Sequence, residues 1–156
     1  MTPPRVFVSY SQDSAEHSAA VLALAQRLRG EGVDVRLDQF VQAPPEGWPR
    51  WMVDQLAEAD LVLVVCTATY RRRFEGREDP GVGRGANFGG LIATRDVFEG
   101  DARNTRYIPV LPPGAKLDDV PALLQPFTRH VLPGGHEGLL RHLTRQPAVV
   151  PDPVIS

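Results

Sequence analysis

The sequence predicts a doubly wound α/β fold, in which helices cover both faces of one parallel sheet. The run at residues 61–65, L-V-L-V-V, is apolar at every position, as in a central strand buried on both sides. Amphipathic helical segments alternate with short apolar runs along the chain. The 156 residues are enough for one domain with its own core. Together these observations predict a flavodoxin-like, five-stranded parallel sheet.

The first strand and the first helix lie near the N-terminus. Residues 5–9, R-V-F-V-S, form a short apolar run that predicts a buried strand. A helix is expected over residues 15–29, capped by Asp13 or Ser14, because short polar side chains bond the free amides of a first turn. Its apolar face is expected to comprise Val21, Leu22, Leu24, Ala25 and Leu28.

The next segments lead to the edge of the sheet. Residues 33–37, V-D-V-R-L, alternate in polarity, which indicates a strand with one covered face, near the sheet edge. A loop is expected over residues 38–47, stiffened by Pro44 and Pro45. A helix is expected over residues 48–59, since the proline in its first turn is compatible with a helix start.

After the central strand the sequence becomes polar and rich in glycine. Residues 70–84 are expected to form a loop, with at least two of the arginines at 71–73 on a solvated face. A helix is expected over residues 85–98. Two adjacent glycines early in that helix would each cost roughly 1 kcal/mol relative to alanine.

The C-terminal part completes the alternation of strands and helices. A fourth strand is expected over residues 107–111, where Pro109 indicates an edge position or a local break in the ladder. Helical turns over residues 117–124, a fifth strand over 128–132 and a closing helix over 136–144 follow. Right-handed crossovers then place the central strand between the first and the fourth.

Composition narrows the class of protein. Residues 1–146 are expected to form one domain, and the proline-rich residues 147–156 a linker to a further domain. The net charge of -2 gives no general attraction to nucleic acid or to anionic membranes. Because Cys66 is the only cysteine, an internal disulfide is excluded, which fits a reducing, cytoplasmic location. Cys66 lies at the end of a buried strand, so we expect it to be a core residue rather than a nucleophile. No apolar run approaches ~20 residues, the N-terminus lacks signal-peptide form, and no zinc-ligand spacing is present.

Candidate binding residues follow the strands, because open α/β sheets bind ligands beyond the carboxyl ends of their strands. Tyr10, Ser11 and Gln12 follow the first strand, Asp38 follows the second, and Cys66, Thr67 and Tyr70 follow the central strand. A hydroxyl such as that of Ser11 can donate to a phosphate or a ribose. Asp38 can accept from a ribose hydroxyl or an adenine amine, or only cap its loop. Trp48 is equally consistent with stacking on a base and with the core, whereas Trp51 is expected to be core.

Other nucleotide and phosphate sites are not indicated. No G-x-G-x-x-G follows the first strand and no G-x-x-x-x-G-K-[ST] occurs, which argues against dinucleotide-fold and P-loop sites. The glycines at 81–85 follow a polar segment rather than a strand and are weak evidence for a phosphate cradle. Asp38, Asp60 and Lys116 do not form the acidic cluster that a Mg²⁺-dependent phosphoacceptor needs.

Several segments together resemble one family. They are V-F-V-S-Y-S at 6–11, V-R-L-D at 35–38, G-W-P-R-W-M at 47–52, A-D-L-V-L-V-V-C-T at 59–67, the segments 70–76 and 83–85, and R-Y-I-P-V at 106–110. In this order and spacing the chain resembles a bacterial SEFIR domain, a relative of TIR domains, over residues 4–145. The resemblance implies a TIR-like fold.

The resemblance also implies two possible activities. SEFIR and TIR domains in animals are often adaptors that self-associate, whereas many bacterial and plant TIR-like domains cleave NAD⁺ at the nicotinamide–ribose bond. In those enzymes a glutamate on the helix after the central strand faces the nicotinamide ribose. Here the segment 87–92 reads N-F-G-G-L-I, so Gly89, after Phe88, occupies the position of the expected catalytic glutamate. Arg84 is expected to pair with the pyrophosphate.

The expectation is an effector domain that hydrolyses NAD⁺ to nicotinamide and ADP-ribose, or a cyclic form, when a sensor partner or attached domain makes it oligomerise. Bacterial antiphage immunity is the expected setting, and this chain is expected to be impaired by Gly89. NAD⁺ is the expected substrate, with no further cofactor. The alternative is a non-enzymatic module that pairs with other SEFIR or TIR domains through residues 38–47 and the helix that follows. The expected substrate-binding residues are Tyr10, Ser11, Gln12, Asp38, Trp48, Thr67, Tyr70, Arg84 and Phe88.

Overall fold

The computed structural model describes residues 3–77, 93, 95, 104, 106–146 and 149–155. Most of the helix expected over residues 85–98 lies outside these residues. Ala93 and Arg95, which are described, are both helical, and Ala93 is fully buried.

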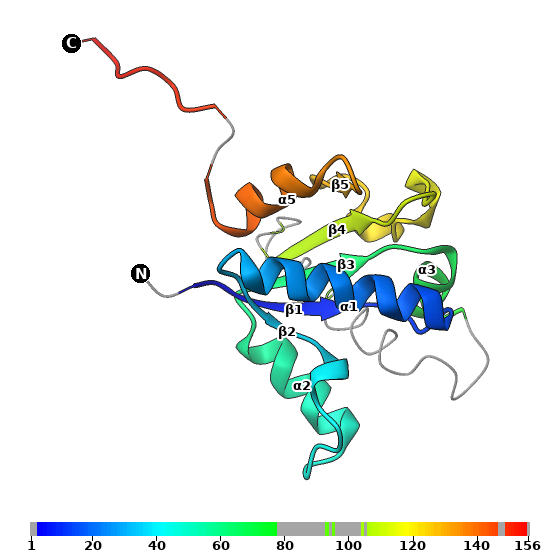
Figure 1. Cartoon of the computed structure of the whole chain (residues 1–156). Helices are drawn as coiled ribbons and strands as arrows, with labels where there is room; N and C mark the ends of the chain where they lie inside the picture. The colour runs from blue at the N-terminus through cyan, green and yellow to red at the C-terminus, as the bar shows by residue number, and fades with distance from the viewer. Residues whose placement is uncertain are drawn as a thin grey trace.

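The described strands form one five-stranded sheet whose pairings are all parallel. They are β1 (Arg5–Ser9), β2 (Asp34–Arg36), β3 (Leu61–Val65), β4 (Tyr107–Leu111) and β5 (His130–Val131). Their order across the sheet is β2-β1-β3-β4-β5 (Figure 1). The predicted position of β3 between β1 and β4, and of β2 at the edge, is confirmed.

Four helices are defined within the described residues: α1 (Ala15–Gly30), α2 (Trp48–Glu58), α3 (Ala68–Phe74) and α5 (His136–Leu143). Three short 3-10 segments accompany them, η1 (Asp38–Phe40), η2 (Leu117–Asp119) and η3 (Ala122–Leu124). Side chains of α1 and α5 belong to one apolar cluster of the sheet, and those of α2, α3 and η3 to the other. The helices therefore cover both faces, as the sequence predicts.

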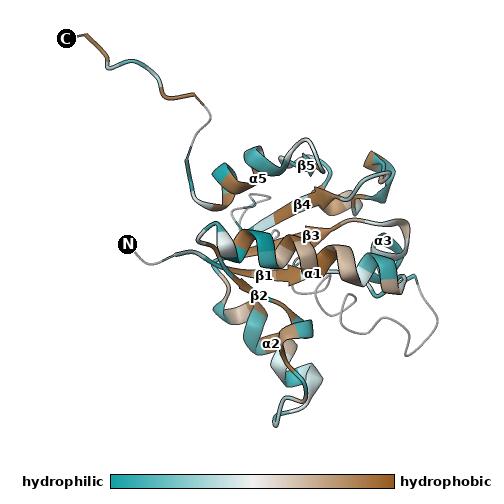
Figure 2. Cartoon of the chain, in the orientation of Figure 1, coloured by the Kyte–Doolittle hydropathy of each residue, from teal (hydrophilic) through white to brown (hydrophobic). Residues whose placement is uncertain are grey.

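Alternation along the central strands divides the core into these two clusters. Val6 and Val8 of β1 pack with α1, whereas Phe7 between them packs with α2. Leu61 and Val62 of β3 alternate in the same way, and every residue of β3 is at most 5% exposed. Figure 2 shows the consequence, with apolar strands inside and polar helix surfaces outside. A strand apolar at every position is thus buried on both faces.

The loop predicted over residues 70–84 is wrong in its first part, because α3 begins directly after β3. The side chain of Thr67 accepts a hydrogen bond from the amide of Tyr70 at 3.1 Å and caps the helix. Tyr70 and Phe74 lie one turn apart, and both are buried against the sheet. The cap and the burial of Tyr70 and Phe74 stabilise α3, even though three charged arginines follow Tyr70.

Pro109 lies inside the sheet rather than at its edge, since β4 pairs with β3 on one side and β5 on the other. The carbonyl of Val110 accepts from Cys66 on the β3 side, and the carbonyl of Leu111 accepts from Leu132 on the β5 side. The backbone N–H and C=O groups of successive residues point to opposite sides of a strand, so the backbone of Pro109 points towards β5. The described pairing with β5 begins only at Val110. The missing amide of Pro109 therefore removes no bond to β3, which corresponds to the predicted local break.

The remaining elements follow the sequence closely. Ser14 is the cap of α1, since its Oγ accepts from the amide of His17 at 3.0 Å. The predicted 38–47 loop opens with the single turn η1. Residues 149–155 contain no helix or strand, and Ile155 is 96% exposed.

Candidate functional site

A cavity of about 310 Å³ opens at the carboxyl end of β1. Such an edge is where parallel α/β sheets bind ligands, and the volume lies at the lower end of the range for small-molecule sites. Its polar lining comprises Ser9, Tyr10, Ser11, Gln12, Asp38 and Arg73, and its apolar lining Phe7, Val8, Trp48 and Met52. The structure thus brings together five of the residues selected from sequence: Tyr10, Ser11, Gln12, Asp38 and Trp48.

Tyr10 and Asp38 form a hydrogen-bonded pair across the cavity wall. The Tyr10 hydroxyl donates to Oδ1 of Asp38 at 2.8 Å. Gln39 donates from Nε2 to the Tyr10 hydroxyl at 3.0 Å and to the Ser18 carbonyl at 2.9 Å, which ties the start of η1 to α1. Partial burial, with the Asp38 carboxylate next, raises the pKa of Tyr10 well above its ordinary value. Tyr10 therefore remains a protonated donor, and the carboxylate of Asp38 keeps further lone pairs for a ligand.

Thr67 and Tyr70 lie behind the lining residues instead of forming part of the cavity wall. The hydroxyls of Ser9 and Tyr70 are 2.7 Å apart, and those of Ser11 and Thr67 are 3.3 Å apart. Tyr70 is only 1% exposed, and burial raises its pKa far above the ordinary value for tyrosine. The Ser11 hydroxyl also donates to Asp13. Tyr70 and Thr67 thus hold in place Ser9, the last residue of β1, and Ser11, which follows the strand.

Arg73 lines the cavity and was not among the residues selected from sequence. Of the three arginines, Arg72 is exposed, whereas Arg71 and Arg73 are partly exposed and partly buried. The signal that could have found Arg73 is its spacing. It follows the buried Tyr70 by three residues, which places both on one side of a helix.

The two tryptophans of α2 have different environments. Trp51 is 8% exposed and packs edge-on against Phe7, with ring centroids 5.9 Å apart, so its predicted place in the core is confirmed. Trp48 is 43% exposed, lines the cavity and meets Trp51 edge-on at 5.5 Å. Trp48 thus offers an exposed aromatic surface at the cavity rim, held in orientation by Trp51.

Cys66 is a core residue, as predicted. It is fully buried, and its thiol donates to the carbonyl of Val64 at 3.4 Å. Burial raises the pKa of the thiol to about 12, so the reactive thiolate is not formed near neutral pH.

Three of the expected site residues, Arg84, Phe88 and Gly89, lie outside the described residues. Within the described ranges, no group of three or more His, Cys, Asp and Glu side chains is arranged to hold a metal ion. Asp60 is remote from Asp38, since it lies just before β3, at the amino end of the sheet, where it accepts from the amide of Arg5 at 2.8 Å.

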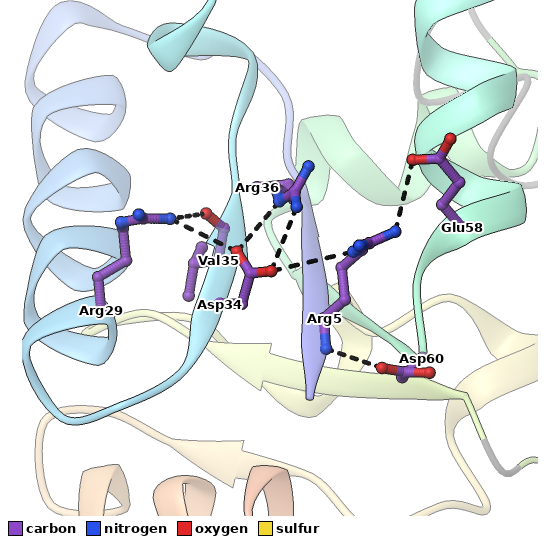
Figure 3. A network of polar contacts seen from close by, with 7 residues as sticks. All are labelled: Arg5, Arg29, Asp34, Val35, Arg36, Glu58 and Asp60. Carbon is purple, nitrogen blue, oxygen red and sulfur yellow. Dashed lines mark hydrogen bonds and ion pairs between the residues drawn. The ribbon is translucent and has the colours of Figure 1, made fainter. Parts of the chain in front are cut away.

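The amino end of the sheet carries an ion-pair network (Figure 3). Arg36 donates to both carboxylate oxygens of Asp34, at 3.0 and 3.2 Å. Arg5 forms two ion pairs, with Nε 3.9 Å from Oδ2 of Asp34 and Nη1 3.7 Å from Oε2 of Glu58. Arg29 donates to the carbonyl of Val35 at 2.8 Å, which occupies a backbone acceptor of the edge strand. These charges have partners of opposite sign, so we assign this end a structural role.

A second hollow of about 410 Å³ lies beside the edge strand β2. Its lining includes Arg29, Arg36, Phe40, Trp51 and Gln55, from α1, β2, η1 and α2. It shares no lining residue with the cavity at the carboxyl end of β1, and none of the expected substrate-binding residues lines it. Of the helices described, none combines the length and the apolar character needed to span a membrane.

The sequence profile of the SEFIR domain matches residues 4–143. The chain belongs to the SEFIR domain family. Its fold agrees with the crystal structure of a prokaryotic SEFIR domain, at 27% identity and a TM-score of 0.65, over 90% of this chain and 98% of that one. No curated protein sequence matches this SEFIR domain.

Two further structures share the fold. One is a metazoan TIR-STING receptor from C. gigas in complex with 2',3'-cGAMP, at 21% identity and a TM-score of 0.62, over 90% of this chain and 39% of that one. The other is a conserved protein from Enterococcus faecalis V583, at 11% identity and a TM-score of 0.55, over 92% and 98% of the two chains. The SEFIR domain therefore has the TIR-like α/β fold.

Proposed function

We propose that this SEFIR domain is an effector of the NAD⁺-cleaving type, which binds NAD⁺ in the cavity at the carboxyl end of β1. The layout of that cavity carries the proposal. Trp48 offers an aromatic surface for a base, Asp38 an acceptor for a ribose hydroxyl, and Arg73 a cation for a phosphate. These three chemistries match the parts of a dinucleotide.

The proposed reaction is hydrolysis of the bond between nicotinamide and ribose. Nicotinamide leaves with the bonding electron pair, water adds to the ribose carbon, and one proton is released, which gives nicotinamide and ADP-ribose. In a cyclic product, a nucleophilic group of the ADP-ribose itself replaces water. The positive charge that develops on the ribose requires a nearby carboxylate. Gly89 supplies none, so we infer that this chain binds NAD⁺ but turns it over slowly at best.

Assembly is the second part of the proposal. By resemblance to TIR and SEFIR domains that self-associate, we infer that a sensor partner or an attached domain brings copies of this SEFIR domain together. Bacterial antiphage immunity is the setting we propose, by resemblance to SEFIR and TIR effectors. Activity then depends on the effective concentration of domains rather than on the isolated chain.

The test restores the missing carboxylate. We expect Gly89→Glu, fused to an oligomerising domain, to release nicotinamide from NAD⁺, measured by chromatography, and to be nearly silent when dilute and unfused. Gly89→Gln has the same size without the charge and is the matched control, expected to stay inactive in both forms. An assembled Gly89→Glu protein that leaves NAD⁺ intact would refute the proposal.

A pure interaction module is the second candidate, supported by the surface around residues 38–47. Phe40 lies in this segment and Trp48 directly follows it; they are 39% and 43% exposed, and Pro44 and Pro45 stiffen the segment. This candidate predicts self-association that persists without nucleotide, is weakened by Phe40→Ser, and is accompanied by no NAD⁺ cleavage in Gly89→Glu.

A further inference from the structure

The three consecutive arginines of α3 have different hydrogen-bond partners. Arg71 donates to Oε1 of Glu75 at 3.2 Å and to the carbonyl of Asp118. Arg72, which is exposed, donates to Oγ1 of Thr69 at 3.1 Å. Arg73 differs, since its Nε is buried and has no hydrogen-bond partner within the described residues.

A buried guanidinium N–H without an acceptor is unfavourable. Hydrogen bonds to charged groups contribute more than neutral ones, and native proteins leave few buried donors unpaired. Because Arg73 lines the cavity, a ligand bound there can accept from its guanidinium, and Nε, which is itself buried, reaches such an acceptor once the side chain rotates. The planar guanidinium fork favours an oxygen anion such as phosphate, which can accept two of its N–H groups.

The charges that line the cavity are arranged separately. Asp38 lines it as well, but its carboxylate accepts from the Tyr10 hydroxyl, and no ion pair joins it to Arg73 among the described residues. A ligand matched to both would place an anionic group at Arg73 and a neutral hydroxyl at Asp38. A nucleotide has this pattern, with a phosphate next to a ribose.

The backbone that carries Arg73 is fixed before any ligand arrives. The Tyr70 hydroxyl is bonded to Ser9 Oγ at 2.7 Å, and Phe74 is buried. Glu75, directly after the helix, accepts from the amide of Ala122 at 3.0 Å. An anion site on this helix therefore needs little reordering of the main chain when the ligand binds.

We propose that Arg73 is the anion-binding residue of the cavity and that it binds a phosphate group of the nucleotide. The identity of the nucleotide rests on the proposed function, whereas the presence of an anion site does not. Free phosphate compounds have the same chemistry as a nucleotide phosphate, so the probes must separate the two sources.

The experiment measures binding by calorimetry with three probes: ADP-ribose, inorganic pyrophosphate and adenosine. None of the three probes has the bond between nicotinamide and ribose, so the missing carboxylate at position 89 does not affect the measurement. For Arg73→Gln we expect a 10- to 100-fold loss in ADP-ribose affinity, on the order of one charge-assisted hydrogen-bond pair, and no change for adenosine. Arg73→Lys keeps the charge and loses the planar fork, so its affinity for ADP-ribose is expected to lie between those of the unaltered chain and of Arg73→Gln. Arg72→Gln, on the same helix but outside the cavity, is the matched control and is expected to bind like the unaltered chain.

The outcomes separate this proposal from the proposed function. Equal ADP-ribose affinity in folded Arg73→Gln and in the unaltered chain overturns the role of Arg73, even if NAD⁺ is bound. Binding of ADP-ribose and pyrophosphate through Arg73, together with no binding of NAD⁺, supports the anion site and refutes the proposed function. If Arg73→Gln does not fold, Arg73→Lys and competition on the unaltered chain decide. Pyrophosphate that fails to displace ADP-ribose there overturns the proposal.

Discussion

The buried hydroxyl pair of Ser9 and Tyr70 allows a quantitative prediction about the base of the cavity. The two oxygens are 2.7 Å apart, Tyr70 is 1% exposed, and Ser9 is 5% exposed and lines the cavity. The two single substitutions should therefore differ. Ser9→Ala leaves the Tyr70 hydroxyl without a partner in the core, which costs roughly 1–3 kcal/mol. Tyr70→Phe leaves Ser9 Oγ where water in the cavity can reach it, so it should cost only about 0.5–1.5 kcal/mol.

The double substitution gives the sharper test. In the Tyr70→Phe background there is no tyrosine hydroxyl to leave unpaired, so Ser9→Ala should add less than about 0.5 kcal/mol. Urea unfolding of all four proteins gives these free energies, and each kcal/mol should also shift the melting temperature by roughly 2–4 °C for a domain of this size. Additive single effects, or a larger loss for Tyr70→Phe than for Ser9→Ala, would show that the two hydroxyls are not coupled as described.

Three further predictions concern ionisable groups. Because burial raises the pKa of Cys66 to about 12, iodoacetamide at pH 8 should label the thiol only in the unfolded protein, and rapid native labelling would contradict its place in the core. Burial lowers the pKa of both His130 and His142, whose ring nitrogens lie 2.9 Å apart, so the folded state binds fewer protons than the unfolded state. The free energy of unfolding should therefore fall as the pH drops below about 6.5. In urea titrations His142→Gln should flatten this loss, and an unchanged pH profile would exclude His142 as its source. The hydrogen bond from Arg36 lowers the pKa of Asp34, so the stabilisation that this pair contributes is present above about pH 4 and is lost on acidification. Asp34→Asn should remove a small part of the fall in unfolding free energy with decreasing pH. A steeper fall in the variant would refute the pairing.

The sheet could be predicted from sequence because burial on both faces leaves a direct trace. Each position of residues 61–65 is apolar, and the alternation of residues 33–37 identifies an edge strand. The helix α3 was missed because its local signals are weak and its sequence is charged. Its formation depends on the Thr67 cap and on burial of Tyr70 and Phe74 against a sheet assembled from distant segments.

The site could be predicted only in part, for a related reason. Residues that leave β1 and β2 at the carboxyl edge, such as Tyr10 and Asp38, follow from the topology of parallel sheets. Arg73 could not, because its place in the cavity depends on the missed helix. Tyr70 lies behind the cavity because its side chain points into the core, a direction that requires the same helix to be known. The second hollow depends on the spacing of α1 and α2 beside β2 and leaves no sequence pattern.

Titration of NAD⁺ into the ¹⁵N-labelled, unaltered chain, followed by NMR, tests the central claim most directly. The account predicts that amide shifts concentrate on residues 9–12 and on Asp38, with the Trp48 indole moving as well. Arg29 and Gln55, in the larger hollow beside β2, are internal controls and should not move. Shifts confined to that second hollow, or no shifts at millimolar NAD⁺, would contradict the assignment of the cavity at the carboxyl end of β1.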